Sequence, residues 1–388
     1  MMRRVYLDNN ATTPVLPEVL EAMRPYFGEH FGNASSIHHH GQETRAAVER
    51  ARESVAALLG CRASEVVFTS GGTEADNLAI FGLVRESDHV ITSTIEHHAV
   101  LNACKHLEEK GCEVTSIPVD GRGVVDPDDV KRALRPKTKL ITIMTANNET
   151  GIVQPVDEIG KIAAEADVYF HTDAVQAAGK IRIDVNKIGC DLLTISGHKI
   201  HAAQGIGALY VRKGTLLEAM LYGGSHERSR RAGTENVPGI VGLGKAAEIA
   251  HAAFERGDDK KMAAMRDQLE IALRHIEATG TNGEAAPRVP NTANIYFDYI
   301  EGEALVIALD LKGLAVSTGA ACSSGAIEPS HVLTAMGLRP DRARASIRFS
   351  LGKQNTPDDI DFALSLVPET VARLRELSPL YNKVAVTP

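Results

Sequence analysis

Several features are missing from this sequence of 388 residues, and each absence excludes a class of protein. No stretch approaches the roughly 18 consecutive apolar residues that a membrane-spanning helix needs. The formal net charge is −8 and no long lysine and arginine run occurs, whereas nucleic-acid-binding proteins usually carry a basic patch. The first residues, MMRRVYLDNNATTP, have no apolar segment behind their two arginines, unlike a secretory signal. The sequence therefore predicts a cytoplasmic protein with no membrane or nucleic-acid partner.

Cysteine is also scarce, and its distribution excludes two kinds of site. The five cysteines are scattered and form no C-x-x-C pair; they are Cys61, Cys104, Cys112, Cys190 and Cys322. Neither a disulfide framework nor a thiolate zinc site is indicated. Four lie in or beside apolar segments and are interpreted as small core residues. Cys322 lies instead in STGAACSSGAIEPS, a small, polar, glycine-containing stretch typical of a loop.

Hydrophobic residues make up 44% of the chain, enough for one large domain and a smaller one, each with its own core. Between about residues 45 and 245, short apolar runs alternate with segments of helical period. The runs are EVVFTS, HVITST, TKLITIMT, VYFHTD, DLLTIS and GALYVR. Such alternation is typical of parallel strands joined by crossover helices. We expect an α/β domain with a mostly parallel sheet flanked by helices.

The rest of the chain has a different pattern. The stretch AAEIAHAAFERGDDKKMAAMRDQLEIALRHIEA predicts a long helical passage, broken near Gly257. After it come the strand-like NTANIYFDY, then GEALVIALDLKG, RASIRFSLG and a closing helix, a pattern that suits a smaller α+β domain. We place the large domain at residues 15–255 and the small domain, which carries Cys322, at residues 1–14 and 256–388.

Polar residues follow three of the predicted strands, at the sheet edge where ligands of open α/β sheets bind. Gly71, Gly72, Thr73 and Glu74 follow the first strand and precede a helix. Glycine backbone N–H groups, a hydroxyl and a helix N-terminus together favour an anion such as phosphate. The same four residues are also an ordinary helix start, with a threonine cap and an acidic first turn. This motif alone does not distinguish a phosphate site from an ordinary helix start.

Asp173 and Lys199 follow two further strands. A carboxylate at the inner end of a buried strand is costly unless it is paired, and a protonated ring nitrogen is a natural partner. An amine nearby can form a Schiff base. Lys199 alone could be a solvated loop residue, but an amine, an acid and a phosphate seat together are what a pyridoxal phosphate site needs.

The sequence closely resembles the NifS/IscS-type cysteine desulfurases, pyridoxal phosphate enzymes of fold type I that are similar to class V aminotransferases. The resemblance runs nearly from end to end. It rests on YLDNNATTP, GNASSIHHHG, FTSGGTEADNLAI, TIEHHAVL, ANNETGIVQP, FHTDAVQAAGKI, SGHKI, RRAGTENVPGI, STGAACSSGAIEPSHVL and IRFSLG. So many ordered motifs exclude a chance resemblance.

The resemblance implies a complete cofactor site. The implied cofactor-binding residues are Gly72, Thr73, His97, Asn148, Asp173, Gln176, Ser196, His198, Lys199 and Thr234. Lys199 would form the Schiff base, His97 would stack on the ring and move protons, and Asp173 would bind the ring nitrogen. Asn148 and Gln176 would lie near the ring oxygen.

Other implied roles concern the phosphate, the partner subunit and the substrate. Gly72, Thr73, Ser196 and His198 would hold the phosphate. Thr234 would reach the phosphate of the other subunit in a homodimer. Arg348 would bind the substrate carboxylate, for which a planar guanidinium is suited. Asn10 and Asn33 are implied as further substrate neighbours.

The implied reaction converts L-cysteine to L-alanine, with Lys199, His97 and Cys322 as catalytic residues. Lys199 removes the α-proton, and the Cys322 thiolate attacks the substrate sulfur to form a persulfide. The sequence CSSGAIEPSHVL resembles the long-loop branch of the family, which passes sulfur to IscU-type iron–sulfur scaffold proteins. Cys322 could also ligate a [2Fe-2S] cluster shared with the scaffold.

One stretch departs from the family pattern. The sequence after Lys199 reads IHAAQGIGAL, where the family usually has a turn similar to Gly-Pro-Lys-Gly. The chain therefore lacks the stiff turn and the positive charge of the family pattern. One expectation is that the cofactor geometry near Lys199, or the activity, is altered. Two alternatives stay open: a selenocysteine lyase or other pyridoxal phosphate enzyme, and a non-catalytic sulfur carrier that binds the scaffold.

Overall fold

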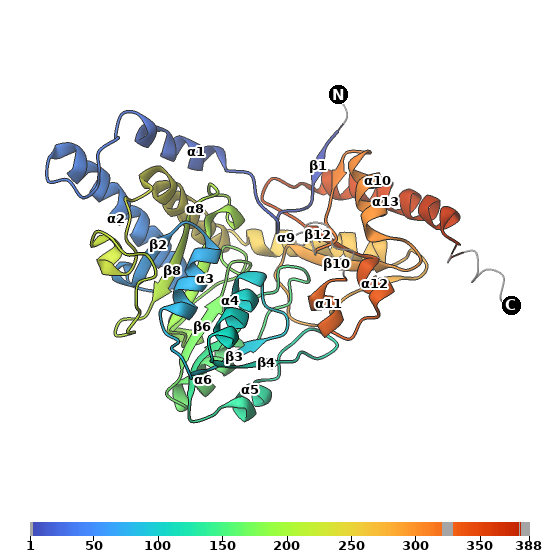
Figure 1. Cartoon of the computed structure of the whole chain (residues 1–388). Helices are drawn as coiled ribbons and strands as arrows, with labels where there is room; N and C mark the ends of the chain where they lie inside the picture. Colours follow the sequence, from blue (N-terminus) through green and yellow to red (C-terminus); the bar gives the residue numbers. More distant parts are fainter. Residues whose placement is uncertain (1–2, 320–328, 380, 382–388) are drawn as a thin grey trace.

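The computed structural model describes residues 3–319, 329–379 and 381, so Cys322 lies outside the described residues. Figure 1 shows a central sheet flanked by helices and, beside it, a smaller group formed by α9–α13, β10 and β12. No helix in the described part of the chain is long and apolar enough to cross a membrane.

The central sheet has seven strands in the order β2-β8-β7-β6-β5-β3-β4. Their bounds are β2 Val66–Thr69, β3 His89–Ser93, β4 Glu113–Ile117, β5 Thr138–Thr142, β6 Tyr169–Asp173, β7 Leu192–Ser196 and β8 Gly207–Val211. The six apolar runs are all confirmed as strands. The pairs β3–β4, β3–β5, β5–β6 and β6–β7 are parallel.

Two details differ from the sequence-based expectation. The run GALYVR was expected to be a parallel strand, but β8 is antiparallel to both β7 and β2. Only residues 197–206 join β7 to β8, and a parallel crossover needs about a dozen residues or more. The edge strand β4 was not predicted, because its sequence EVTSI is largely polar and partly exposed.

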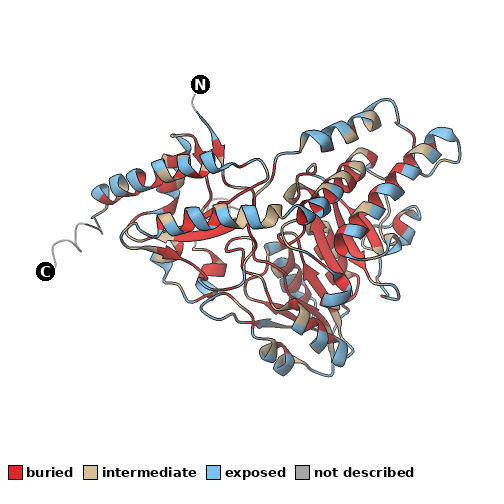
Figure 2. Cartoon of the chain, turned by 180° about the vertical axis from the view of Figure 1, so that it is seen from behind, coloured by how far each residue is buried: buried red, intermediate tan, exposed pale blue. Residues whose placement is uncertain are grey.

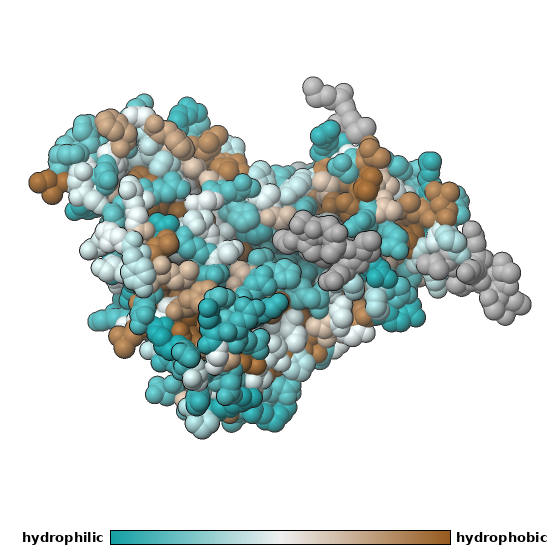
Figure 3. Space-filling view, viewed as in Figure 1, coloured by the Kyte–Doolittle hydropathy of each residue, from teal (hydrophilic) through white to brown (hydrophobic). Residues whose placement is uncertain are grey.

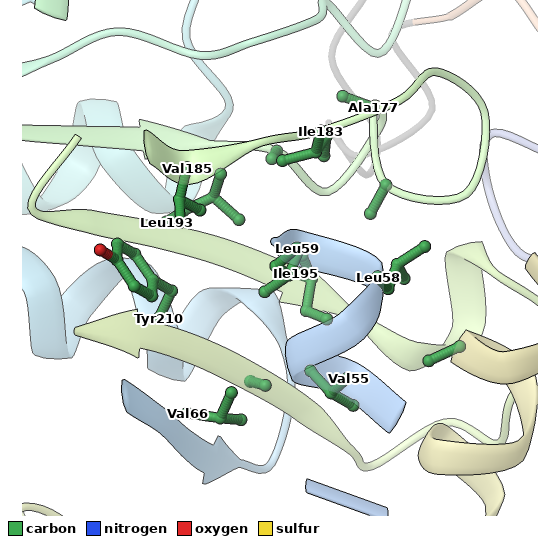
Figure 4. Packing of buried hydrophobic residues seen from close by; sticks show 14 of the residues in the cluster. Val55, Leu58, Leu59, Val66, Ala177, Ile183, Val185, Leu193, Ile195 and Tyr210 are labelled. Carbon is green, nitrogen blue, oxygen red and sulfur yellow. The ribbon is translucent and has the colours of Figure 1, made fainter. Parts of the chain in front are cut away.

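Helices cover both faces of this sheet. They are α2 His39–Leu59, α3 Gly72–Phe81, α4 His98–Glu109, α5 Pro127–Ala133, α6 Val156–Glu165, α7 Val185–Ile188 and α8 Val237–Glu255. Side chains of a strand alternate between faces, so Leu193 and Ile195 pack with α2 while Leu192 packs with α3 and α4. Figure 4 shows Leu59 of α2 beside Ile195, with Val55 farther along the same helix. Figure 2 shows buried strands between helices whose outer surfaces are exposed.

The smaller group is built on an antiparallel sheet of β9 Thr279–Thr281, β10 Thr292–Phe297 and β12 Ser346–Ser350. The helices of this region are α9 Asp258–Leu273, α10 Gly302–Asp310, α11 His331–Ala335, α12 Pro340–Arg344 and α13 Pro357–Leu377. The predicted break near Gly257 is confirmed, because this residue has φ +69° between α8 and α9. The region has its own hydrophobic core.

The N-terminal segment connects the two sheets. β1, Val5–Tyr6, pairs in parallel with β11, Leu314–Ala315. The chain then follows β12, where the Asn9 N–H donates to the Ser350 carbonyl over 3.0 Å, and crosses to the large sheet before α1, Pro17–Met23. Residues 8–13 therefore lie between the carboxyl end of the central sheet and the small sheet.

Candidate active site

A cavity of about 380 Å³ lies at the carboxyl ends of the central strands. We call it the site cavity. It is lined by Asn10, Ala11, Gly72, Thr73, Asp76, His97, Met144, Ala146, Asn148, Asp173, Val175, Gln176, Ser196, His198, Lys199, Gly319 and Arg348. Its volume is within the range of roughly 300–1,000 Å³ that is typical of small-molecule sites. Eleven residues expected from the sequence therefore meet in one place, although they come from segments far apart in the chain.

The turn from β2 into α3 forms one end of the site cavity. Gly72 is the first residue of α3, and a Cβ atom there would lie 2.9 Å from Val175 Cγ2. Because glycine has no Cβ atom, the backbone can approach the Val175 side chain this closely without a clash. The first N–H groups of a helix have no intrahelical partner and attract anions. Thr73 is exposed and Ser196 is buried at the same end.

His198 also lines this end. Its Nδ1 atom lies 3.2 Å from Thr12 Oγ1. Burial, and then the nearby Lys199, lower the pKa of His198 to about 4. The ring is therefore neutral at pH 7.

Asp173, the last residue of β6, is the buried acid of the site cavity. Its Oδ1 accepts a hydrogen bond of 2.8 Å from the Val175 N–H. Burial raises the pKa of Asp173 to about 6, although this hydrogen bond and Lys199 act in the opposite direction. A cationic partner would stabilise the ionised form, because it would restore the interactions that the carboxylate loses on leaving water.

Asp76 is a second acid in the site cavity that the sequence analysis did not identify. It is 1% exposed, and its Oδ1 has no hydrogen-bond partner in the described structure. His171 Nε2 lies 3.6 Å from this oxygen. Burial, and then repulsion from Asp173, raise the pKa of Asp76 well above its ordinary value. The surroundings of Asp76 therefore favour its protonated form.

His97 begins α4 as its N-cap. Its Nδ1 accepts a hydrogen bond of 3.1 Å from the Ala99 N–H, so the proton of the neutral ring is on Nε2. Burial, and then Lys199, lower the pKa of His97 to about 4. The ring is therefore an uncharged aromatic surface on the wall of the site cavity.

Lys199 ends η3, the 3-10 turn Gly197–Lys199 after β7. Its Nζ donates to the carbonyl oxygens of Asn10 and Ala11 over 2.6 and 2.7 Å. The N-terminal segment therefore holds the amine in the site cavity. These two carbonyl acceptors fix the position of the amine.

Asn10 contacts both sheets through its side chain. Its Oδ1 accepts from Lys180 and Asn291, and its Nδ2 donates to the Asn148 carbonyl and to Thr292 Oγ1. These four hydrogen bonds use all of its donors and both acceptor positions of its oxygen. The geometry therefore favours a positioning role for Asn10 over direct contact with a substrate.

Arg348 projects from β12 toward the site cavity and is 3% exposed. Its Nη2 donates to Asp8 over 2.7 Å and its Nη1 to the Asn148 carbonyl over 3.0 Å. Its buried Nε has no partner among the described residues. The guanidinium therefore retains donor capacity that an additional carboxylate could use.

Two residues expected from the resemblance lie away from the site cavity in the described chain. Asn33 is exposed and its Oδ1 accepts from the Ser35 N–H. Thr234 is exposed in the segment between η4, His226–Ser229, and α8. Neither lines the site cavity. Their roles therefore stay predictions.

The unusual turn after Lys199 is firmly held. His201 has φ +69°, its N–H donates to Thr13 Oγ1 over 2.9 Å, and its Nδ1 lies 3.0 Å from the Pro14 carbonyl. The Ala202 N–H donates to the Gly197 carbonyl over 3.0 Å. The sequence HAAQG thus forms an ordered turn, hydrogen-bonded to Gly197 of η3 and to the N-terminal segment.

The donor set of the site cavity fits pyridoxal phosphate. The close approach at Gly72 and the α3 N-terminus suit the phosphate, buried Asp173 suits a protonated ring nitrogen, and Lys199 suits the aldehyde. His97 provides an aromatic wall. Asp8, Asp76 and Lys180 were missed, because a lone acid or lysine in a sequence gives no sign of which side chain it will meet.

Comparison with known proteins is consistent with this geometry. A family model described as aminotransferase class-V matches residues 5–362. A protein of Methanosarcina thermophila named cysteine desulfurase IscS is 51% identical over 385 residues, which cover 98% of this chain and 95% of that protein.

Two solved structures are similar as well. One, titled NifS-like protein, has a TM-score of 0.89 and 38% identity and covers 96% of this chain and 100% of its own. Another, titled SspA in complex with cysteine, has a TM-score of 0.80 and 38% identity over 89% of this chain and 98% of its own. Both the sequence and the fold are thus shared over nearly the whole chain.

Proposed function

The chain belongs to the class-V aminotransferase family and has the activity of a pyridoxal-phosphate-dependent cysteine desulfurase, and we propose that it donates the sulfur for iron–sulfur cluster assembly. One observation carries the assignment of the site: Lys199, Asp173 and Arg348 line a single cavity. An amine, a buried acid and a guanidinium are what a cofactor aldehyde, a ring nitrogen and an amino-acid carboxylate require.

The residues that would hold the cofactor surround the site cavity. Gly72, Thr73, Ser196 and His198 would bind the phosphate, Asp173 the ring nitrogen, and Lys199 the aldehyde carbon. His97 would cover the ring, with Asn148 and Gln176 near the ring oxygen. When bound, pyridoxal phosphate withdraws electrons from the α-carbon of an amino acid joined to it, which acidifies the α-proton.

The protein groups then bind the substrate and move its proton. Arg348 binds the cysteine carboxylate through donors that Asp8 and Asn148 leave unused. Lys199 takes the α-proton, and the two carbonyl oxygens that accept its hydrogen bonds hold the amine in place. His97, neutral at pH 7, keeps water from one side of the reacting carbon without adding a charge.

Sulfur transfer requires a thiolate, and Cys322 is our candidate, although it lies outside the described residues. A bond forms between Cys322 Sγ and the substrate sulfur while the carbon–sulfur bond breaks. The electron pair of the broken bond passes to the substrate carbon, which takes up a proton. The products are alanine and a persulfide on Cys322, with no other oxidant or reductant needed.

We further propose a homodimer in which Thr234 completes the partner's phosphate site. Thr234 is exposed and does not line the cavity of its own chain. Phe27, Phe31 and Ile37, which lie between α1 and α2, are 69%, 71% and 87% exposed. Figure 3 shows several hydrophobic residues, separated by hydrophilic ones, at the end of the molecule formed by these helices. Three exposed large apolar side chains in one short segment support its burial against a second copy.

The acceptor that we propose is an IscU-type scaffold protein, with Cys322 as a possible ligand of a [2Fe-2S] cluster shared with it. The support is the relative of Methanosarcina thermophila, whose name includes IscS, at 51% identity. Transfer of radiolabelled sulfur from cysteine to a purified scaffold tests this part. Label that stays on the desulfurase would contradict it.

The enzymatic proposal is tested by the release of alanine from cysteine with a reductant. The wild type, reconstituted with pyridoxal phosphate, should be yellow and should release one alanine per sulfur. Lys199→Ala should lose both the visible band and alanine release, whereas Cys322→Ala should keep the band and lose release. Cys61→Ala is the matched control, since Cys61 lies outside the site cavity. Release by Cys322→Ala at the wild-type rate would sink the persulfide step.

Mixing two inactive variants tests the dimer. Lys199→Ala has no amine but still carries Thr234, and Thr234→Ala has the amine but lacks the hydroxyl. If Thr234 serves the partner, heterodimers regain one complete site and therefore release alanine. An inactive mixture that contains heterodimers by mass spectrometry would argue against a shared site.

A further inference from the structure

Lys180 lies outside the site cavity but is linked to two of its residues. Its Nζ donates to Gln176 Oε1 over 2.6 Å and to Asn10 Oδ1 over 2.8 Å. Gln176 Nε2 in turn donates to the Asn10 carbonyl over 3.0 Å, the oxygen that also accepts from Lys199. We call Asn10, Gln176 and Lys180 the rear cluster.

The local fold explains why Gln176 and Lys180 meet. The segment after β6 forms helix-like turns, in which the Ala178 N–H donates to the Ala174 carbonyl and the Ile181 N–H to the Ala177 carbonyl. Residues four apart lie on the same face of such a segment. Gly179, with φ +70°, then lets the chain pass Ile200 closely. Both side chains consequently point toward the N-terminal segment.

The rear cluster fixes which way the Gln176 amide faces. Lys180 Nζ donates to Oε1, so the oxygen end of the amide is the end that faces Lys180. The NH₂ end then uses one hydrogen for the Asn10 carbonyl. Its second hydrogen is not used by Lys180 or Asn10, and Gln176 lines the site cavity.

From this geometry we propose that Lys180 is a positioning residue that holds Gln176 with its amide NH₂, and not its carbonyl, toward the ring oxygen of the cofactor. The inference rests on the proposed function and deepens it. In the opposite orientation, Gln176 would present a carbonyl oxygen to an oxygen of the ring. Two acceptors facing one another repel, so the orientation of one amide would alter how the cofactor holds its proton.

The surroundings of Lys180 make its two hydrogen bonds important. Burial, and then Lys199 and Arg348, lower the pKa of Lys180 well below its ordinary value. The other titratable neighbour is His201, whose own pKa is lowered to about 4, chiefly by burial. Lys180 therefore depends on its two acceptors, Gln176 Oε1 and Asn10 Oδ1, to compensate for the water it loses on burial.

Titration of the visible band of the bound cofactor tests the proposal without measuring activity. In Lys180→Met, only the Asn10 carbonyl is left to orient the amide. In the molecules whose amide turns, the ring oxygen loses a donor, so the cofactor should keep its proton to a higher pH. The expected rise in the spectral pKa is about one unit, the size of one hydrogen bond to a charged group. Lys180→Gln keeps a donor for Gln176 Oε1 and should shift less than half as much.

The matched control is Lys353→Met. Lys353 and Lys180 both line a second cavity of about 60 Å³, which Lys199 also lines, but in the described part of the chain no hydrogen bond links the Lys353 amine to the rear cluster. Its spectral pKa should equal that of the wild type. A shift in Lys353→Met as large as in Lys180→Met would overturn the proposal, because it would show a general effect of removing an amine.

A double variant separates positioning from simple loss of structure. In the Gln176→Leu background there is no amide to orient, so Lys180→Met should add no further shift. A full shift in that background, or an unchanged spectral pKa in Lys180→Met alone, would overturn the inference. A wild type with no visible band after reconstitution would instead overturn the proposed function, and the two failures are therefore distinguishable.

Discussion

The two sides of Lys199 are built in opposite ways. On the side of the site cavity, polar groups keep unused capacity: Asp76 Oδ1 and Arg348 Nε have no hydrogen-bond partner in the described structure. On the side of the rear cluster, every polar group of the Asn10 side chain is bonded to protein. One side is open to a ligand, and the other resists displacement.

This difference shows where the protein tolerates a cost in stability. A buried carboxylate with a raised pKa, such as Asp173, destabilises the fold when it is ionised without a partner. The hydrogen bonds to the Asn10 and Ala11 carbonyls keep Lys199 in place even when Asp173 is ionised without a partner. Substitutions on the ligand-binding side should therefore lower cofactor affinity, whereas loss of the Asn10 side chain in the rear cluster should act mainly on stability.

The largest effect is expected from Asp173→Asn. Removing the buried charge that would pair with the ring nitrogen should lower the catalytic efficiency by roughly a hundredfold or more. The affinity for pyridoxal phosphate, measured by fluorescence titration, should fall with it. Asp191→Asn is the control, since Asp191 is also an acid of raised pKa but lies at the start of β7, at the opposite edge.

The same variant should have a more stable apoprotein at neutral pH. The pKa of folded Asp173 is raised to about 6 from an ordinary value of 3.8, so the native state binds its proton more tightly than the unfolded chain. The stability of the wild type is consequently lost as the pH rises from about 4 to 6. Relative to wild type, Asp173→Asn should gain about 3 kcal/mol across this window, measured by urea unfolding. A difference that does not vary with pH would contradict the raised pKa.

The contrast between the two sides also explains what the sequence could predict. Lys199, Asp173 and Gly72 follow apolar strands, and the rule that ligands bind at strand ends identified them before any family resemblance. Asp76 lies within a helix and Lys180 in a turn, and neither has a periodic signal that points to the site. Their importance depends on which side chains fold against them.

Topology was predictable to a similar extent. Apolar runs identified six strands of the large sheet, but their direction depends on the connections. The short link between β7 and β8 contains no crossover helix, and this is what makes β8 antiparallel. The polar edge strand β4 lacks the apolar run on which the prediction relied.

An effect of similar size, confined to stability, is expected from Asn10→Ala. The substitution leaves the buried donors of Asn291 and Lys180 without their acceptor, and a buried unsatisfied group costs about 1–3 kcal/mol. We expect a loss of roughly 3 kcal/mol in the free energy of unfolding of the apoprotein. Asn186→Ala, at an exposed position, is the control. A change below about 1 kcal/mol would mean that the rear cluster does not hold the two sheets together.

The smallest effect is expected from His201→Gly, in the turn that departs from the family pattern. The left-handed backbone conformation at φ +69° costs a residue with a side chain about 1–2 kcal/mol. Glycine adopts this conformation without that cost. It would also lose the hydrogen bond between His201 Nδ1 and the Pro14 carbonyl, worth about 1 kcal/mol. Because these terms oppose one another, the free energy of unfolding should change by less than about 1 kcal/mol, and the visible spectrum should stay that of the wild type. A shifted spectrum at unchanged stability would show that His201 acts on Lys199 through the backbone, and the unusual turn would then belong to the ligand-binding side of the comparison.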